Sequence, residues 1–259
     1  MNKIALVTGA SSGIGRDISR SLAKRNYNLI IVARDNDKLQ ALKKDLKEEY
    51  KIDVEIILKD LSNKDNCIDL YNEVSKKYGA IDILVNNAGF GTCGYFVDTD
   101  LEKEISMINT NITAVHILTK LFLKDMVKEN KGHILNVASI AGFMAGPMMA
   151  TYYSTKSYIV RLTESIRMEL FMRNSKVKIS ALCPGPVNTN FNKIADVKFN
   201  LPGQSSQFVA EYAVKKLLKN RTLIFPSFGI WIYRILCKIL PDHITSFINY
   251  FMQKRKIQY

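Results

Sequence analysis

The feature that most constrains the fold is a regular alternation of short apolar segments with longer amphipathic ones. The short segments are mostly continuous in Val, Ile and Leu, which is typical of strands buried on both faces. Strands that alternate with helices form a parallel sheet with helices on both faces. The sequence therefore predicts an α/β fold, a doubly wound parallel sheet of about seven strands, at Ile4–Thr8, Leu29–Ala33, Val54–Leu58, Ile81–Val85, His133–Ala138, Lys178–Leu182 and Thr222–Phe225.

The segments between these strands have helical spacing of apolar residues. In one of them Leu39, Leu42 and Leu46 recur at intervals of three and four residues, and charged residues fill the opposite face. No linker or repeat interrupts the order, so we expect one domain over residues 1–225 with a loop-rich substrate segment at 183–205. An apolar and basic extension follows at 226–259. The expected helices are Arg16–Arg25, Asp37–Tyr50, Asn63–Tyr78, Asp100–Glu129 and Tyr152–Arg173.

Composition excludes several classes of protein. The 259 residues include 37 Lys and Arg against 24 Asp and Glu, a net charge of +13, but no zinc-finger, RRM or helix-turn-helix pattern accompanies it. The four cysteines form no CxxC or Cys/His cluster, so we expect free thiols, no metal site and a cytoplasmic location. The longest uncharged run near the C-terminus has 12 residues, 222–233, whereas a membrane span needs roughly 20. We recognise no secretory signal.

A glycine-rich segment, residues 8–15, joins the first expected strand to a helical pattern. Glycines allow a tight strand-to-helix turn and let the backbone approach a ligand closely. The helix N-terminus then offers free N–H groups and partial positive charge to a pyrophosphate. The alternative is a turn that binds nothing, but the position after the first strand favours phosphate binding.

The spacing TGxxxGxG of this segment resembles the short-chain dehydrogenase/reductase superfamily. Further motifs of that superfamily follow in order at later strand ends, and the resemblance covers about residues 1–225. It implies a Rossmann-type fold in which an Asp binds the adenine, NNAG lines the cofactor floor and a Pro-Gly turn touches the nicotinamide. The implied cofactor-binding residues are Gly9, Ser11, Ser12, Gly13, Ile14, Gly15, Asp60, Leu61, Asn87, Ala88, Gly89, Pro184, Gly185, Val187 and Thr189.

The end of the second expected strand bears on the choice between NAD(H) and NADP(H). An acidic side chain there would accept hydrogen bonds from the ribose 2′-OH and repel a 2′-phosphate. This chain has Ala33 at the matching position and Arg34 next to it, and a guanidinium can pair with the 2′-phosphate. Asp35 lies one position beyond Arg34. As an acid near the expected acidic position, it weakens the inference of 2′-phosphate binding without reversing it. We therefore expect NADP(H) to be favoured over NAD(H).

The catalytic motif of the superfamily matches Tyr152 and Lys156, four residues apart and therefore on one face of a helix. The same YxxxK spacing occurs at residues 212–216 and 250–254, but only Tyr152 has the superfamily's serine, Ser139, 13 residues upstream. Asn111 matches the fourth catalytic residue, which positions a water in a proton relay. The resemblance also assigns Lys156 to the nicotinamide ribose and places Tyr152 at the cofactor.

The electrostatics of the Tyr–Lys pair are consistent with acid–base catalysis. A phenol titrates near 10, so phenolate at pH 7 is unfavourable by about 4 kcal/mol. An ammonium about 4 Å away contributes about 4 kcal/mol at an effective dielectric of about 20. We therefore expect Lys156 to lower the pKa of Tyr152, which would serve as general acid or base. The Ser139 hydroxyl would bind the substrate oxygen as charge develops on it.

These residues together predict an NADP(H)-dependent reductase that interconverts an apolar carbonyl compound and a secondary alcohol. A steroid-like ketone, a 3-oxoacyl chain and another lipophilic ketone all remain open as substrates. The extension at 226–259 is interpreted as a lid, a subunit contact or a segment lying on a membrane surface. The superfamily implies a homodimer or homotetramer. The alternatives are a non-catalytic dinucleotide sensor or scaffold and a nucleic-acid binder, and we expect no nucleic-acid partner.

Overall fold

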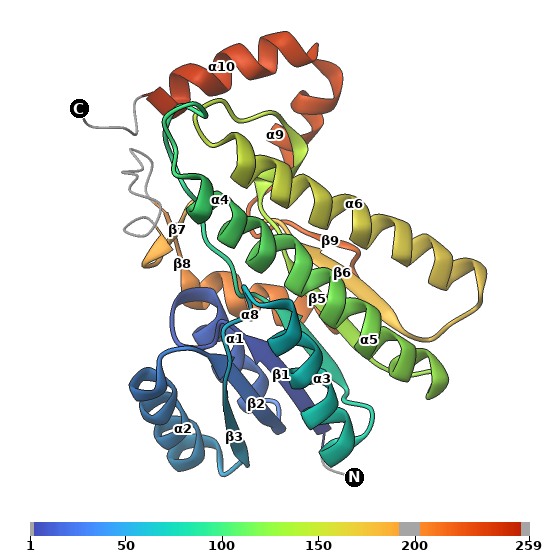
Figure 1. Cartoon of the computed structure of the whole chain (residues 1–259). Helices are drawn as coiled ribbons and strands as arrows, with labels where there is room; N and C mark the ends of the chain where they lie inside the picture. The colour runs from blue at the N-terminus through green and yellow to red at the C-terminus, as the bar shows by residue number, and fades with distance from the viewer. Residues whose placement is uncertain (1–2, 192–202, 255–259) are drawn as a thin grey trace.

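A parallel sheet forms the centre of the computed structural model, which describes residues 3–191 and 203–254 (Figure 1). Seven strands hydrogen-bond in the order β3-β2-β1-β4-β5-β6-β9, and each pair is parallel. The predicted doubly wound α/β fold is confirmed. The strands are β1 (Lys3–Thr8), β2 (Tyr27–Ala33), β3 (Val54–Leu58), β4 (Ile83–Asn86), β5 (His133–Val137), β6 (Lys178–Leu182) and β9 (Leu223–Ile224), with a separate parallel pair β7 (Val187–Asn188) and β8 (Gln204–Ser205).

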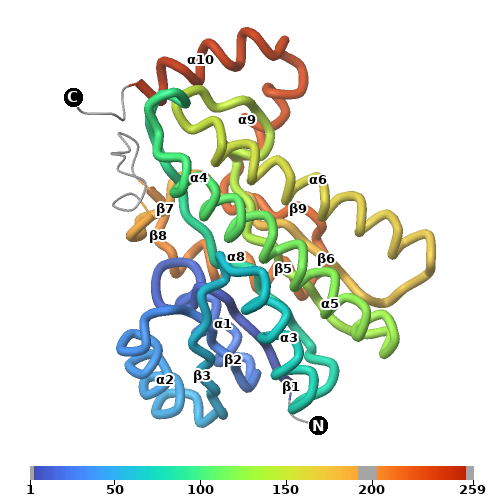
Figure 2. The backbone as a smooth tube through the Cα atoms, viewed as in Figure 1, coloured from blue at the N-terminus to red at the C-terminus, as the bar shows by residue number. Residues whose placement is uncertain are grey.

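Helices cover both faces of the sheet (Figures 1 and 2). Alternate residues of each strand point to opposite faces: in β1, Ala5 and Val7 belong to one buried cluster and Leu6 to the other. The first cluster includes residues of α1 (Gly13–Ala23), α2 (Asn36–Tyr50) and α8 (Ser206–Leu217). The second includes residues of α3 (Lys64–Tyr78), α5 (Val115–Lys128) and α6 (Ala150–Met172). Helices therefore shield both faces of the sheet from solvent, which explains the uninterrupted apolar runs in the strands.

The segment 100–129 differs from the single helix expected. It consists of α4 (Leu101–Ile108), a π-helical segment η1 (Asn109–Ala114) and α5. The widened turn contains Asn111, whose buried side chain bonds the backbone of Phe90 instead of facing solvent. The apolar periodicity does not show such an interruption, because the pattern continues on both sides of it.

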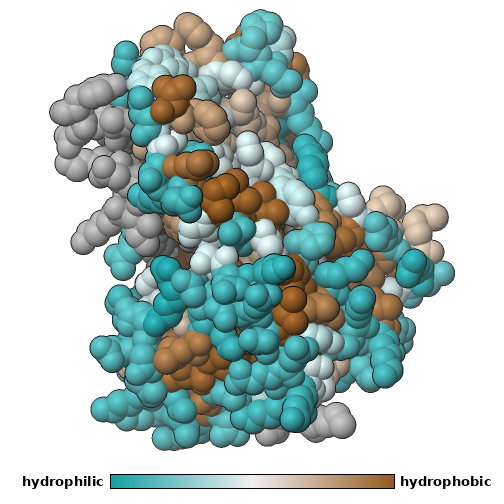
Figure 3. All heavy atoms as spheres, viewed as in Figure 1, coloured by the Kyte–Doolittle hydropathy of each residue, from teal (hydrophilic) through white to brown (hydrophobic). Residues whose placement is uncertain are grey.

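The extension folds into two helices, α9 (Phe228–Ile239) and α10 (Asp242–Lys254). They lie near the loops at the carboxyl ends of the strands, and α10 is drawn in red at the top of Figure 1. Hydrophobic side chains are exposed in the upper part of this face (Figure 3). No helix within residues 3–191 and 203–254 has the length and apolar character needed to cross a membrane.

Candidate active site

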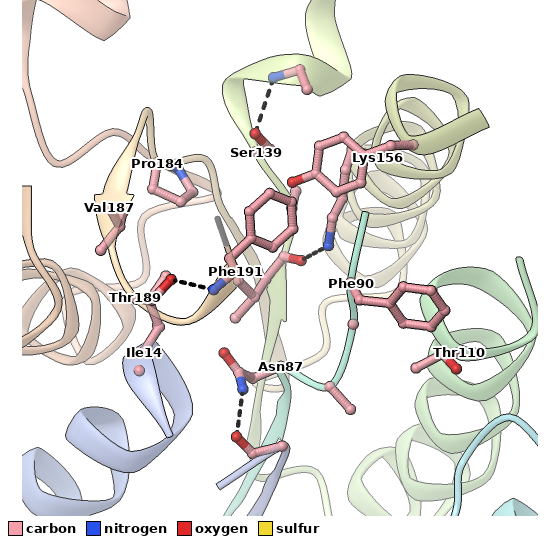
Figure 4. Close-up of a pocket in the computed structure, with 18 of the residues that line it drawn as sticks. Ile14, Asn87, Phe90, Thr110, Ser139, Lys156, Pro184, Val187, Thr189 and Phe191 are labelled. Carbon is pink, nitrogen blue, oxygen red and sulfur yellow. Dashed lines mark hydrogen bonds between the residues drawn. The ribbon is translucent and has the colours of Figure 1, made fainter. Parts of the chain in front are cut away.

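A cavity of about 1010 Å³ opens at the carboxyl ends of the strands, where a doubly wound sheet places its ligands. The cavity brings together residues from distant parts of the chain (Figure 4). Gly15 and Asn111 are the two predicted site residues that do not line it. The predicted residues that do are Gly9, Ser11, Ser12, Gly13, Ile14, Arg34, Asp60, Leu61, Asn87, Ala88, Gly89, Ser139, Tyr152, Lys156, Pro184, Gly185, Val187 and Thr189.

The glycine-rich turn is held against the loop after β4. Thr8 Oγ1 accepts hydrogen bonds from the backbone N–H groups of Asn87 at 3.0 Å and Ala88 at 3.1 Å. Asn87 Nδ2 donates to the carbonyl oxygens of Thr8 and Gly9 at 3.0 and 3.1 Å. Gly15 packs behind this contact, since a Cβ there would lie 2.3 Å from Asn87 Nδ2. The side chains that fix the turn are thus those of the two predicted motifs.

The N-terminus of α1 fits a phosphate group. Ser12 is its N-cap and makes no side-chain capping bond, and no acidic residue lies in the first turn. The first backbone bond within the helix runs from Arg16 N to Ser12 O, so the N–H groups of residues 13–15 have no partner within the helix. Gly13 has a φ of +53°, a conformation that favours glycine. These groups line or adjoin the cavity and could hold a pyrophosphate.

Charged residues surround the cavity at the end of β2. The Arg34 side chain is 73% exposed, and its Nη1 lies 3.4 Å from Asp60 Oδ2. Asp35 caps α2 by accepting from Lys38 N at 3.1 Å, and it also pairs with the Lys38 ammonium. These bonds lower the pKa of Asp35. Burial would raise the pKa of Asp60, but hydrogen bonds from Ser62 and the charge of Arg34 lower it overall. The acid nearest Arg34 in sequence is therefore already engaged by α2.

Ser139, Tyr152 and Lys156 meet at the other end of the cavity. Ser139 ends the loop after β5 and accepts a hydrogen bond from Ala141 N at 3.1 Å. Tyr152 and Lys156 share one face of α6, and the Lys156 ammonium lies 5.8 Å from the centre of the Tyr152 ring. Lys156 Nζ donates to the carbonyl oxygen of Val137 at 2.9 Å (Figure 4). A partly buried phenol, a hydroxyl and a buried ammonium therefore share one wall.

Burial controls the protonation of this group. It raises the pKa of Tyr152 to about 12, although a hydrogen bond with Ser139 acts in the opposite direction. Burial lowers the pKa of Lys156 to about 8. The net direction thus differs from the expected lowering of the Tyr152 pKa by Lys156: desolvation is the largest influence on both groups, and the ammonium bonds the carbonyl oxygen of Val137. Tyr152 is a protonated phenol at neutral pH.

The other two YxxxK pairs lie outside the catalytic wall. Lys216 lies over the Tyr212 ring on α8 at 5.1 Å, and Lys254 over the Tyr250 ring on α10 at 6.0 Å. Neither pair lines the cavity. No group of three or more His, Cys, Asp or Glu side chains suited to a metal ion occurs within residues 3–191 and 203–254.

A family model described as short chain dehydrogenase matches residues 3–197. The chain belongs to the short chain dehydrogenase family. It is an oxidoreductase of the kind that uses a nicotinamide dinucleotide. An NADP-dependent 3-hydroxy acid dehydrogenase of Schizosaccharomyces pombe is 31% identical over 243 residues, 87% of this chain and 93% of that protein.

Two solved structures of short-chain dehydrogenases are also similar to this chain. The enzyme of Sphingobium yanoikuyae, in complex with NADPH, has a TM-score of 0.82 and 28% identity over 87% of this chain and 88% of that one. A short-chain dehydrogenase/reductase of Burkholderia phymatum, in complex with NAD, has a TM-score of 0.82 and 24% identity, covering 91% and 92%. The second likeness concerns the fold alone.

Asn111 occupies a different place from the other predicted residues of this short chain dehydrogenase. It is 1% exposed. Its Oδ1 accepts from Phe90 N at 3.1 Å, and its Nδ2 donates to Phe90 O at 2.9 Å and to Thr155 Oγ1 at 3.1 Å. The side chain is therefore committed to fixing the loop after β4 against α6. A role for Asn111 in positioning a water stays a prediction.

The cavity also contains residues that the sequence motifs of the dehydrogenase do not reveal. Six of them come from α9 and α10: Gly229, Ile230, Tyr233, Asn249, Met252 and Gln253. Asn249 Nδ2 donates to Ala145 O at 2.8 Å, and Tyr250 OH lies 3.1 Å from Tyr95 OH. The apolar spacing of the extension was the available signal, but it does not say what the two helices pack against.

Proposed function

We propose that the protein is an NADP(H)-dependent oxidoreductase that interconverts an apolar ketone and a secondary alcohol. The observation that carries this proposal is the common wall formed by Ser139, Tyr152 and Lys156 in a cavity that also contains a helix N-terminus free of acidic residues. A dinucleotide placed along the cavity would have its phosphates near α1 and its nicotinamide near Tyr152.

The residues at the end of β2 support a preference for NADP(H). Arg34 is exposed at the rim of the cavity and its nearest charged partner is Asp60, at 3.4 Å. Asp35, the acid that could bind a ribose 2′-OH, is occupied by Lys38. A 2′-phosphate would meet a guanidinium there, and a planar guanidinium suits bidentate phosphate binding.

The chain's own residues would manage the proton. When bound, the reduced cofactor supplies a hydride to the carbonyl carbon. Tyr152, a phenol with a pKa of about 12, would donate its proton to the carbonyl oxygen as negative charge develops there. Ser139 would donate a hydrogen bond to the same oxygen. The Lys156 ammonium would stabilise the negative charge left on Tyr152 and hold the nicotinamide ribose.

The wall beyond these residues favours an apolar substrate. Met144, Met149, Phe191, Ile230 and Met252 also line the cavity, and the Phe191 ring lies 5.3 Å from the Tyr152 ring. Methionine side chains adapt to ligands of different shape. A lipophilic ketone would therefore be bound mainly by apolar contact, with polar groups fixing its orientation.

The proposal is tested by replacing the catalytic phenol. We expect Tyr152→Phe to lower kcat for ketone reduction by at least about 100-fold, a typical contribution of a general acid, and to leave the Kd for NADPH unchanged. The matched control is Tyr158→Phe, because Tyr158 lies on the same helix but bonds His116 at 2.7 Å outside the cavity. Tyr152→Phe activity equal to that of Tyr158→Phe would contradict the assignment.

A further inference from the structure

Helix α10 has an inverted distribution of polar and apolar side chains. In α2, an ordinary surface helix of this protein, the three buried residues are leucines, and charged side chains face solvent. In α10 the buried residues are the polar Thr245, Asn249 and Gln253, none of them more than 6% exposed. The apolar residues are the exposed ones, at the helical spacing of a single face: Ile244, Phe247, Ile248 and Phe251.

Hydrogen bonds fix α10 in this orientation. Asn249 Nδ2 donates to Ala145 O and Asn249 Oδ1 accepts from Tyr233 OH, both at 2.8 Å. Gln253 Nε2 donates to the Tyr153 hydroxyl. Turning the helix to bury its phenylalanines would break these bonds, and each lost bond would leave a buried polar group unsatisfied. The exposure of the apolar residues is therefore a consequence of how α10 is bound to the rest of the chain.

Helix α9 has the same polarity. Its Arg234 side chain is 18% exposed and packs inward, with the guanidinium 5.2 Å from the Phe143 ring and 5.6 Å from the Phe225 ring. We call the exposed apolar residues of α9, together with the four of α10, the outward face. Figure 1 shows α10 at the upper edge of the molecule. The residues of α9 that belong to the outward face are Phe228, Trp231, Ile232, Leu236 and Ile239.

The charges around the outward face are mostly positive. Lys238 and Lys254 are exposed on the two helices, and Asp242 is the one acid between positions 228 and 254 of the sequence. Lys216 and Arg221 line a second hollow, of about 450 Å³, beside the first turn of α9. Within residues 3–191 and 203–254 these four cations form no ion pair. They can therefore bind an anionic partner.

Two apolar partners could cover the outward face, a second copy of this chain or a lipid membrane. A two-fold contact would bring the same basic surface of both copies together, with Asp242 as the one acid of each extension. An anionic membrane supplies acyl chains for the apolar residues and negative headgroups for the lysines. Tryptophan, present in the face as Trp231, is enriched at the boundary between headgroups and acyl chains. The charges therefore favour the membrane.

We propose that α9 and α10 dock this protein on an anionic phospholipid membrane, with the outward face at the boundary between headgroups and acyl chains. The helices would lie along the membrane surface instead of crossing it. Their inner sides line the cavity with Ile230, Tyr233 and Met252, so a docked molecule would hold the cavity within about 10 Å of the lipid, one helix diameter. This inference is separate from the proposed reaction and does not depend on the substrate.

Trp231 makes docking directly measurable, because it is the only tryptophan of the chain. The full-length protein is titrated with vesicles of phosphatidylcholine, with and without phosphatidylglycerol; co-sedimentation gives the Kd, and the emission of Trp231 reports its surroundings. We expect at least about tenfold tighter binding to the anionic vesicles, the effect of two lysines near a charged surface. The emission of Trp231 should shift to shorter wavelength, and brominated acyl chains should quench it.

Variants of the apolar residues test whether the outward face is the surface that docks. Phe247→Ser combined with Phe251→Ser should weaken binding to anionic vesicles by at least about tenfold, because burial of one phenylalanine already contributes that much. The matched control is Phe171→Ser, since Phe171 on α6 is 68% exposed and Phe247 is 66% exposed; it should leave the Kd unchanged. Circular dichroism checks folding, and Phe247→Ser alone is used if the double variant does not fold.

Charge variants test the choice of lipid. Lys238→Gln combined with Lys254→Gln should weaken binding to the anionic vesicles by at least about tenfold. The same pair should leave binding to phosphatidylcholine alone unchanged, because that surface carries no net charge. Equal weakening on both kinds of vesicle would contradict the anionic preference.

The proposal is overturned by absence of binding to anionic vesicles, by binding without quenching of Trp231, or by equal weakening in Phe171→Ser and in the paired phenylalanine variant. If the wild-type protein does not bind vesicles and the paired phenylalanine variant has a lower mass by light scattering, a second copy covers the outward face instead. None of these measurements uses ketone reduction, so failure of the proposed function leaves their outcome unaffected.

Discussion

Raising the pH should slow reduction by removing the proton of Lys156. Burial lowers the pKa of this group from 10.5 to about 8, so the ionised fraction falls from about 0.9 at pH 7 to about 0.1 at pH 9. The ionised form is the active one, because its charge offsets the negative charge that forms on Tyr152. The reductase activity is therefore at its maximum well below pH 8, and it is lost as the pH rises through 8.

The distance in the structure sets the size of the effect. The Lys156 ammonium lies 5.8 Å from the centre of the Tyr152 ring; two unit charges about that far apart interact by about 3 kcal/mol at an effective dielectric of about 20. That energy is roughly a 100-fold difference in rate. We expect kcat/KM to fall about tenfold for each pH unit above 8 and to level off about 100-fold below its plateau.

The assay measures the initial rate of NADPH oxidation at saturating ketone. From these rates kcat/KM for NADPH is determined as a function of pH. This parameter reports the pKa values of the enzyme before the cofactor binds. Lys156→Met, which has no ionisable group at this position, should be slow and independent of pH over the same interval. A wild-type profile that is flat up to pH 10, or a falling limb that persists in Lys156→Met, would refute the reasoning.

Three further predictions concern the cofactor, the assembly and the extension. Arg34→Asp should shift the ratio of kcat/KM for NADPH over NADH at least about tenfold toward NADH, whereas Arg20→Asp, a control whose side chain pairs with Asp45 away from the cavity, should leave it unchanged. Light scattering should give the mass of a homodimer or homotetramer, and a monomer would contradict this. The full chain should float with anionic phospholipid vesicles through residues 226–259, and replacing the exposed side chains of Phe228 and Trp231 by serine should weaken flotation; absence of flotation would end the membrane prediction.

Much of the fold could be predicted because its signals are local. The strands are continuous apolar runs, and the segments between them have helical spacing. Val54–Leu58 and Lys178–Leu182 were predicted with the bounds that the structure has. Ser139, Tyr152 and Lys156 could be grouped because their spacing resembles the catalytic motif of the short-chain dehydrogenase/reductase superfamily.

The remaining features depend on contacts between distant residues. Gln253 bonds a residue 100 positions away, and Asn249 one 104 positions away, and no motif predicts such pairs. The widened turn at Asn109–Ala114 contains Asn111, whose side chain bonds the backbone of the distant Phe90. The pKa of Tyr152 depends on burial, whereas the sequence indicates only that a lysine lies on the same helix face.

The central claim is tested most directly by mixing the purified protein with NADPH or NADH and a panel of steroidal ketones, 3-oxoacyl thioesters and aryl ketones. We predict oxidation of NADPH that requires a ketone, exceeds oxidation of NADH and disappears in Tyr152→Phe. Tight binding of NADPH without oxidation by any member of the panel would contradict it and would favour a dinucleotide-binding sensor or scaffold on the same fold.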